Sequence, residues 1–161
     1  MSKPVMTREE LIKHADAMLL SHENVLKDKI DALYTKMSVM DCRFFRKIWP
    51  NVINMEEVPS DKIYLQTIQA DSGQPMSRVS RQIERLQNNG LVLWERGESG
   101  TYIQMSNKGF DLYQEQMDIL LNYIERVIDK LGEERMKQII KAIAELESAL
   151  NSEMPAADAE V

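Results

Sequence analysis

Cysteine is almost absent from this sequence. Cys42 is the only one in 161 residues, so no disulfide can form within the chain, which suits a reducing cytoplasm. No apolar run approaches the length of a membrane span, and Met1 to Pro4 lead into a charged segment rather than a secretory signal. A nucleophile elbow, a P-loop, a dinucleotide fingerprint and a metal-binding motif are also missing. We therefore expect a cytoplasmic protein, with no membrane association, that is not an enzyme and holds neither a metal ion nor another cofactor.

The net charge of −6 argues at first against a nucleic-acid partner. Charge is unevenly placed, however, because residues 72–109 contain five basic and three acidic residues. A local basic surface is what DNA attracts, and a dimer would double it. The charge alone leaves open whether these are ordinary solvated arginines or a binding surface.

Long amphipathic helices are expected at both ends of a single domain spanning residues 1–161. Thr7 and Glu10 form a capping box at the start of a helix over residues 8–34. Ser106 caps a second helical region over 107–151, which Gly132 interrupts. These helices carry more apolar surface than the middle of the chain can cover, so we expect them to form a dimer interface. The small, acidic tail over 152–161 is expected to be disordered.

The middle of the chain, residues 37–106, is predicted to form three helices followed by a hairpin. Ser38 caps the first of these helices, and Pro50 ends it. Ser60 is expected to cap a short second helix that runs to about Ala70. Pro75 then suits the first position of the third helix.

The third helix is predicted to end at Asn88-Asn89-Gly90, and two strands follow it. The strands cover Leu91–Arg96 and Thr101–Met105, with a turn at Gly97–Gly100 between them. The order helix, turn, helix, hairpin indicates a winged helix-turn-helix. The fold class is therefore mainly α with a small β-hairpin wing, flanked by long N- and C-terminal dimerisation helices.

The third helix of this module has the two faces that a DNA-recognition helix needs. Val79, Ile83 and Leu86 form its buried stripe, and the polar side chains project elsewhere. Arginine can bond guanine bidentately, and serine and glutamine can reach phosphates or base edges. The predicted DNA-binding residues of the helix and the wing are Ser77, Arg78, Ser80, Arg81, Gln82, Arg85, Arg96, Ser99 and Gly100.

Two of these assignments differ from the rest. Arg85 lies far along the helix, so we expect it to contact a phosphate, although pairing with the neighbours of Glu84 or with the wing is equally open. Arg96 is the only basic residue near the wing tip, and Glu98 beside it would repel phosphate. The wing is therefore expected to contact DNA weakly, through Arg96 and the backbone of Ser99 and Gly100.

At these residues the sequence resembles the multiple-antibiotic-resistance (MarR) family of winged helix-turn-helix transcriptional regulators. Val79–Leu86 followed by Asn89-Gly90-Leu91-Val92 resembles the family's recognition helix and first wing strand. Met105–Gly109 resembles the end of the second wing strand, and Leu131–Glu134 resembles the start of the C-terminal helix. The sequence departs from the family at the wing tip, which lacks the expected arginine.

The resemblance implies a homodimer whose two recognition helices meet successive major grooves of a pseudo-palindromic double-stranded DNA operator. It implies a transcriptional regulator, most often a repressor, that is relieved by a small-molecule effector. It also suggests a ligand site bordered by Trp49 and Tyr64. The alternative function is a winged-helix module that binds another protein without sequence-specific DNA binding. Cys42 is either a redox sensor or, as its apolar helix face favours, a buried structural residue.

Overall fold

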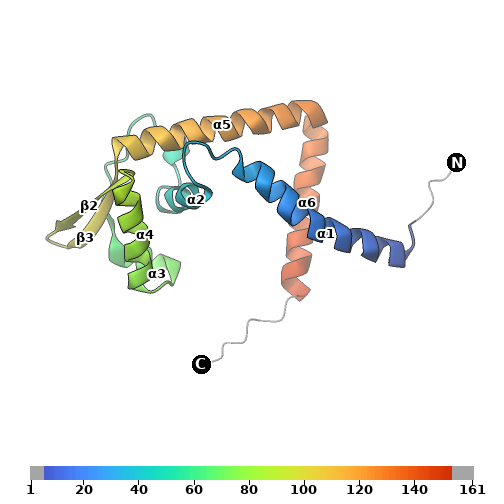
Figure 1. The fold of residues 1–161 in the computed structure, drawn as a ribbon, viewed down its shortest axis with the longest axis horizontal. Coiled ribbons are helices and arrows are strands. Elements are labelled where there is room, and N and C mark those ends of the chain that lie inside the picture. The colour runs from blue at the N-terminus through green and yellow to red at the C-terminus, as the bar shows by residue number, and fades with distance from the viewer. Residues whose placement is uncertain (1–5, 154–161) are drawn as a thin grey trace, which may run out of the picture. The chain divides into compact units, whose positions relative to one another are not determined.

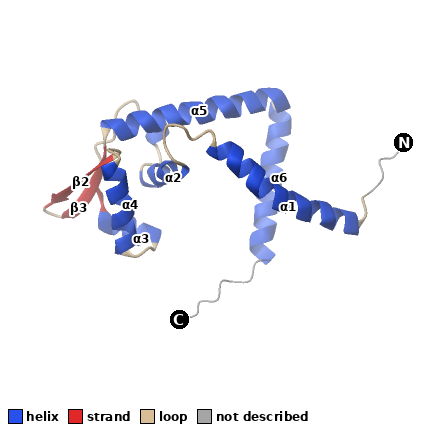
Figure 2. Cartoon of the chain, in the orientation of Figure 1, coloured by secondary structure: helices blue, strands red, loops and turns tan. Residues whose placement is uncertain are grey.

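The computed structural model describes residues 6–153, with residues 18–26 described by their backbone alone. The chain divides into two compact units, Met1–Ile119 and Leu120–Val161, and the boundary falls within one continuous helix, α5 (Asn107–Leu131). Figure 1 follows the chain from α1 to α6, and Figure 2 shows that helices dominate it. The mainly α fold class predicted from the sequence is confirmed.

The first unit contains most of the secondary structure. Its helices are α1 (Arg8–Asp31), α2 (Val39–Ile48), the 3₁₀ helix η1 (Val52–Asn54), α3 (Leu65–Ser72), α4 (Met76–Asn88) and the first part of α5. The helices begin at the predicted N-caps. Thr7 and Glu10 form a capping box, and the Ser38 side chain accepts a hydrogen bond from the Asp41 amide. Ser106 likewise accepts the amide of Gly109 at the start of α5, with the donor and acceptor atoms 2.9 Å apart.

The wing is a three-stranded antiparallel sheet and not the two-stranded hairpin that the sequence predicts. Its strands are β1 (Ile63–Tyr64), β2 (Val92–Gly97) and β3 (Gly100–Met105), in the order β1-β3-β2. Strand β1 pairs with β3 and so gives the β2–β3 hairpin a hydrogen-bonded neighbour, which an isolated two-stranded ribbon lacks. In Figure 2 the β2–β3 hairpin extends beside α4.

The prediction of a helix from Ser60 to Ala70 is wrong at its start. Residues 60–62 are irregular, and β1 pairs Ile63 with Ile103 and Tyr64 with Tyr102 before α3 begins. Tyr64 is the N-cap of α3, and the Ser60 carbonyl accepts a hydrogen bond from Gln104 instead of beginning a helix. The β-branched and aromatic pair 63–64 therefore follows β-propensity, once β3 supplies a partner.

Smaller differences concern the ends of helices. Pro75 is the N-cap of α4 and not its first helical residue. The first helix ends at Asp31 rather than Tyr34, and the last helix, α6 (Glu133–Glu153), extends to Glu153. The rest of the tail predicted to be disordered, 154–161, lies outside the described residues.

The core of the first unit joins α2, α4, the sheet and the start of α5. Phe45, Ile83 and Ile103 are fully buried there, and Tyr113 packs against Phe45 with ring centroids 5.8 Å apart. Gly109 allows α5 to cross the start of β2, because a Cβ at this position would lie 2.1 Å from the Leu91 carbonyl oxygen. This core packs α4 and the wing against α2 and the start of α5.

The second unit consists of the last part of α5 and α6. Gly132, at φ 86°, separates the two helices in a backbone conformation that favours glycine. No residue of α6 is buried, although apolar side chains recur along the helix at three- and four-residue spacing. None of the helices formed by residues 6–153 combines the length and the hydropathy needed to cross a membrane.

Candidate nucleic-acid interface

Helix α4 separates its apolar and polar side chains onto opposite faces. Val79, Ile83 and Leu86 are buried, as predicted, because positions three and four apart share one side of a helix. Ser77 and Arg81 fall on the opposite side, and both are exposed. Arg78 is also exposed, and neither arginine forms an ion pair with any residue in the described part of the chain.

The two flanks of α4 face different neighbours. Ser80 and Met76 lie on the flank that borders the wing, where they line a cavity shared with the hairpin. Gln82 lies on the other flank, where it lines a cleft formed with α2. The residues predicted to bind DNA are therefore divided among three sides of one helix, and only those near Ser77 and Arg81 face straight outward.

The cavity between α4 and the wing has a volume of about 580 Å³. Trp94 and Arg96 of β2 line it together with Ser99, Gly100 and Thr101 at the hairpin end. Arg96 is the only charged residue in this lining. The arrangement joins Ser80, Arg96, Ser99 and Gly100, four of the predicted residues, around one positively charged hollow.

The hairpin tip is tighter than the sequence suggests. Gly97 pairs with Gly100, so the turn itself contains only Glu98 and Ser99, and Gly100 has a φ of 121°. Behind the tip, the Tyr102 hydroxyl donates a 2.8 Å hydrogen bond to Glu95, and this bond to the carboxylate raises the pKa of the tyrosine. Glu95 therefore has a partner within the sheet, whereas the exposed Glu98 remains as negative charge at the tip.

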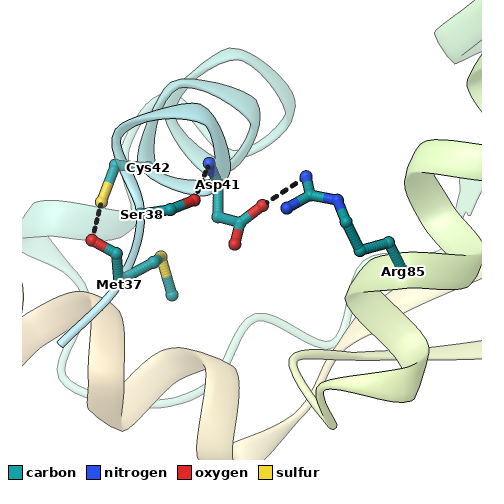
Figure 3. A network of polar contacts seen from close by, with 5 residues as sticks. All are labelled: Met37, Ser38, Asp41, Cys42 and Arg85. Carbon is teal, nitrogen blue, oxygen red and sulfur yellow. Dashed lines mark hydrogen bonds and ion pairs between the residues drawn. The ribbon is translucent and has the colours of Figure 1, made fainter.

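Arg85 is held within the chain. Its guanidinium donates to Asp41 Oδ1 at 2.7 Å, and the Asp41 side chain is only 6% exposed against 41% for Arg85. Figure 3 shows Arg85 reaching from α4 to the first turn of α2, where Ser38 caps the Asp41 amide. The sequence offered the neighbours of Glu84 or the wing as intrachain partners of Arg85, whereas the structure pairs it with Asp41 of α2. This geometry favours pairing within the chain over the phosphate contact that the sequence predicts.

Comparisons with known proteins give structural matches only. No protein-family model matches the chain, and no curated protein does. AbsC, a MarR family transcriptional regulator from Streptomyces coelicolor, is 20% identical with a TM-score of 0.57, and the match covers 94% of this chain and 100% of that chain. The chain has the fold of the MarR-family regulators.

Two other solved structures with this MarR fold carry a partner. S. aureus MepR in a complex with DNA is 15% identical with a TM-score of 0.59, over 83% of this chain and 96% of that chain. The heme sensor PefR from Streptococcus agalactiae, in complex with heme, is 15% identical with a TM-score of 0.60, over 99% of this chain and 100% of that chain. At these identities the likeness shows the fold alone.

Cys42 lies in the core of the MarR fold, on the buried side of α2. The side chain is 5% exposed, its Sγ lies 4.0 Å from the Met37 carbonyl oxygen, and burial raises the pKa of the thiol to about 12. A redox-sensing cysteine needs an accessible thiolate at neutral pH. The geometry therefore favours the structural alternative.

The two residues suggested for a ligand site lie in different surroundings. Trp49 is 2% exposed and packs edge-on against Phe45, with ring centroids 5.4 Å apart. Tyr64 lines the cavity between α4 and the wing, and Trp49 is not part of that lining. A ligand site bordered by both residues stays a prediction.

Sequence reasoning missed two buried polar residues that hold the MarR fold together. Asp41 lies in the first turn of α2 and binds Arg85, which its place in the sequence does not predict. Gln116 is fully buried, donates to the Leu33 carbonyl at 2.9 Å and accepts from the Lys36 amide at 3.0 Å. A helix-face pattern gives no signal for either role, because both partners are distant in sequence.

Proposed function

We propose that the chain is a homodimeric, sequence-specific DNA-binding transcriptional regulator of the MarR family. The observation that carries the proposal is the exposed part of α4, where Ser77, Arg78 and Arg81 project away from the buried stripe. The major groove of DNA is wide enough to admit such a helix, and phosphates flank it on both sides. The MepR–DNA complex supports this use of the fold.

Base reading is assigned to the outward side chains and phosphate binding to the wing cavity. Among the described side chains none forms an ion pair with Arg78 or Arg81, and their guanidinium groups can reach a guanine edge bidentately. Arg96, Ser80 and the backbone at Ser99 and Gly100 surround a hollow whose single charged lining residue is positive. These groups fit a phosphate better than a base edge, and they would set the register of the protein on the duplex.

Dimerisation is supported by the apolar surface of α6. Ile140 is 60% exposed and Ile143 is 51% exposed, and Leu146 and Leu150 continue the same stripe. A contiguous apolar stripe of this kind marks an interaction site in a water-soluble protein, and a second copy of the chain would cover it. Two copies would present two recognition helices to one pseudo-palindromic duplex.

The experiment is salt-dependent binding to labelled duplex DNA taken from upstream of the chain's own coding sequence. We expect Arg81→Ala to lower the affinity for this duplex by about 1–3 kcal/mol while leaving the oligomeric state unchanged. Arg126→Ala removes the same charge from an exposed site on α5 and should leave the affinity unchanged. Absence of binding at low salt would support the alternative, a winged-helix module that binds protein, which the negative wing tip at Glu98 also motivates.

The dimer is tested separately by sedimentation. Ile143→Glu places a charge in the apolar stripe of α6 and is expected to yield monomers that bind the duplex weakly. Ser148→Glu adds the same charge to another side of α6 and should leave the dimer intact. A dimer that survives Ile143→Glu at micromolar concentration would place the interface elsewhere.

Repression relieved by a small-molecule effector is the regulatory mode that we propose. The heme complex of PefR shows one protein of this fold with a bound small molecule. A ligand that binds one spacing of the two recognition helices better than another would shift the population away from the DNA-binding form. Loss of the gel-shifted complex on adding a ligand, reversed on its removal, is the measurement.

A further inference from the structure

A second positively charged surface lies on the side of α4 that faces away from the wing. Here α2, α3 and α4 enclose a cleft of about 280 Å³, with Phe44 and Val79 among its apolar lining. Arg43 and Lys47 of α2 line the cleft, together with Gln74 from the turn and Gln82 from α4. The lining contains no acidic residue.

The two α2 cations occupy one side of their helix. Arg43 and Lys47 are four residues apart, so their side chains lie one above the other. Both are exposed, and neither forms an ion pair with any residue between 6 and 153 for which side chains are described. The segment 36–47 contains four basic residues and one acidic residue, and that acidic residue, Asp41, is buried against Arg85.

The placement of these cations matches that of a DNA strand. A recognition helix in the major groove has a phosphate backbone on each side of it. Arg96 lies toward the wing flank of α4, and Arg43 and Lys47 lie toward the opposite flank, next to Gln82. We propose that Arg43 and Lys47 bind phosphates of the strand that borders the α2 side of the groove. This inference rests on the proposed DNA-binding function.

The test is the salt dependence of DNA binding by the full chain carrying Arg43→Ala and Lys47→Ala together. Each lost phosphate contact reduces the slope of log affinity against log salt by about 0.9, so the slope should fall by about 1.8 per bound protomer. Phosphate contacts carry no sequence information, so the variant should bind the upstream duplex and an unrelated duplex of equal length more weakly by the same factor.

Arg46→Ala is the matched control. Arg46 belongs to the same helix, but its guanidinium points to α5, where it lies 3.4 Å from Met117 Sδ. Its removal changes the net charge of α2 without touching the cleft, so the slope should equal that of the unmodified chain. Lys47→Arg, which keeps the charge, should also keep the slope.

The outcomes separate this inference from the function on which it rests. If the double variant shows the slope of the unmodified chain while Arg81→Ala still weakens binding, the α2 contact is refuted and the DNA-binding function stands. If Arg46→Ala lowers the slope as much per charge as the double variant does, the effect is one of overall charge and the inference fails. If the unmodified chain binds no duplex at low salt, the proposed function itself is wrong.

Discussion

Removal of the Asp41 carboxylate should destabilise the chain through the half-buried Arg85 that it leaves behind. Removing one partner of a fully buried ion pair lowers the free energy of unfolding by about 3–5 kcal/mol, whereas an exposed pair contributes about 0.2–1 kcal/mol to it. Asp41 is 6% exposed and Arg85 is 41% exposed, so water can still reach the unpaired guanidinium. We therefore expect Asp41→Ala to lower the free energy of unfolding by about 1–3 kcal/mol.

The assay is urea denaturation at one fixed protomer concentration, because dimerisation makes the apparent stability depend on concentration. Asp118→Ala removes an exposed carboxylate from α5 and should change the free energy of unfolding by less than about 0.5 kcal/mol. The pair itself is measured by the double variant Asp41→Ala with Arg85→Ala. If the two single effects add within about 0.5 kcal/mol, the side chains are not coupled and the reasoning is refuted.

The same variants decide the role of Arg85 in DNA binding. If Arg85 is a structural residue, Arg85→Ala lowers the unfolding free energy and leaves the salt slope of DNA binding unchanged. If it binds a phosphate, as the sequence also allowed, the slope falls by about 0.9 per protomer. A lowered slope with unchanged stability would contradict the assignment made from the ion pair.

Two further predictions concern the core. Gly109→Ala should lower the free energy of unfolding by at least about 1–3 kcal/mol, because the added Cβ would lie 2.1 Å from the Leu91 carbonyl oxygen. Thermal unfolding measures this loss as a lower Tm. An unchanged Tm would show that α5 can shift freely. Cys42 should react with a thiol reagent at pH 8 only as fast as the chain unfolds, because its thiol is buried and its pKa is raised to about 12. Since the folded pKa exceeds the ordinary value of 9.0, the stability that this thiol contributes is complete below pH 9 and is lost as pH rises toward 12. Cys42→Ala should therefore lose less stability than the unmodified chain over that range, and rapid labelling of the native protein would contradict the prediction.

The features predicted well from the sequence are those with local causes. Thr7, Ser38 and Ser106 cap helices that follow within one turn, and the buried stripe of α4 needs only the period of the helix. Gly90 follows the C-cap of α4 at φ 73°, a backbone conformation that favours glycine, so this helix end also has a local cause. Each of these signals lies within a few residues of the structure that it specifies.

The features that were missed depend on distant partners. The strand β1 has two residues and exists because Ile103 and Tyr102, about forty positions later, pair with it. The roles of Asp41 and Gln116 depend on partners 44 and 80 residues away. The same holds for the cleft beside α2, whose lining comes from three helices. A sequence pattern identifies which side chains leave a helix surface, but not what they meet.

The structure also changes how many charges are available to DNA. Because Arg85 is paired with Asp41, α4 offers only Arg78 and Arg81, and the wing adds Arg96. Because Arg78 and Arg81 are assigned to base edges, the phosphate contact of Arg96 alone would give a salt slope of about −0.9 per protomer. Addition of Arg43 and Lys47 would bring the slope to about −2.7. The salt slope of the unmodified chain therefore distinguishes two arrangements. In one, only α4 and the wing contact DNA; in the other, Arg43 and Lys47 also bind the strand on the α2 side of the groove. The second arrangement explains how a chain with a net charge of −6 and a negative wing tip at Glu98 would retain an electrostatic hold on DNA.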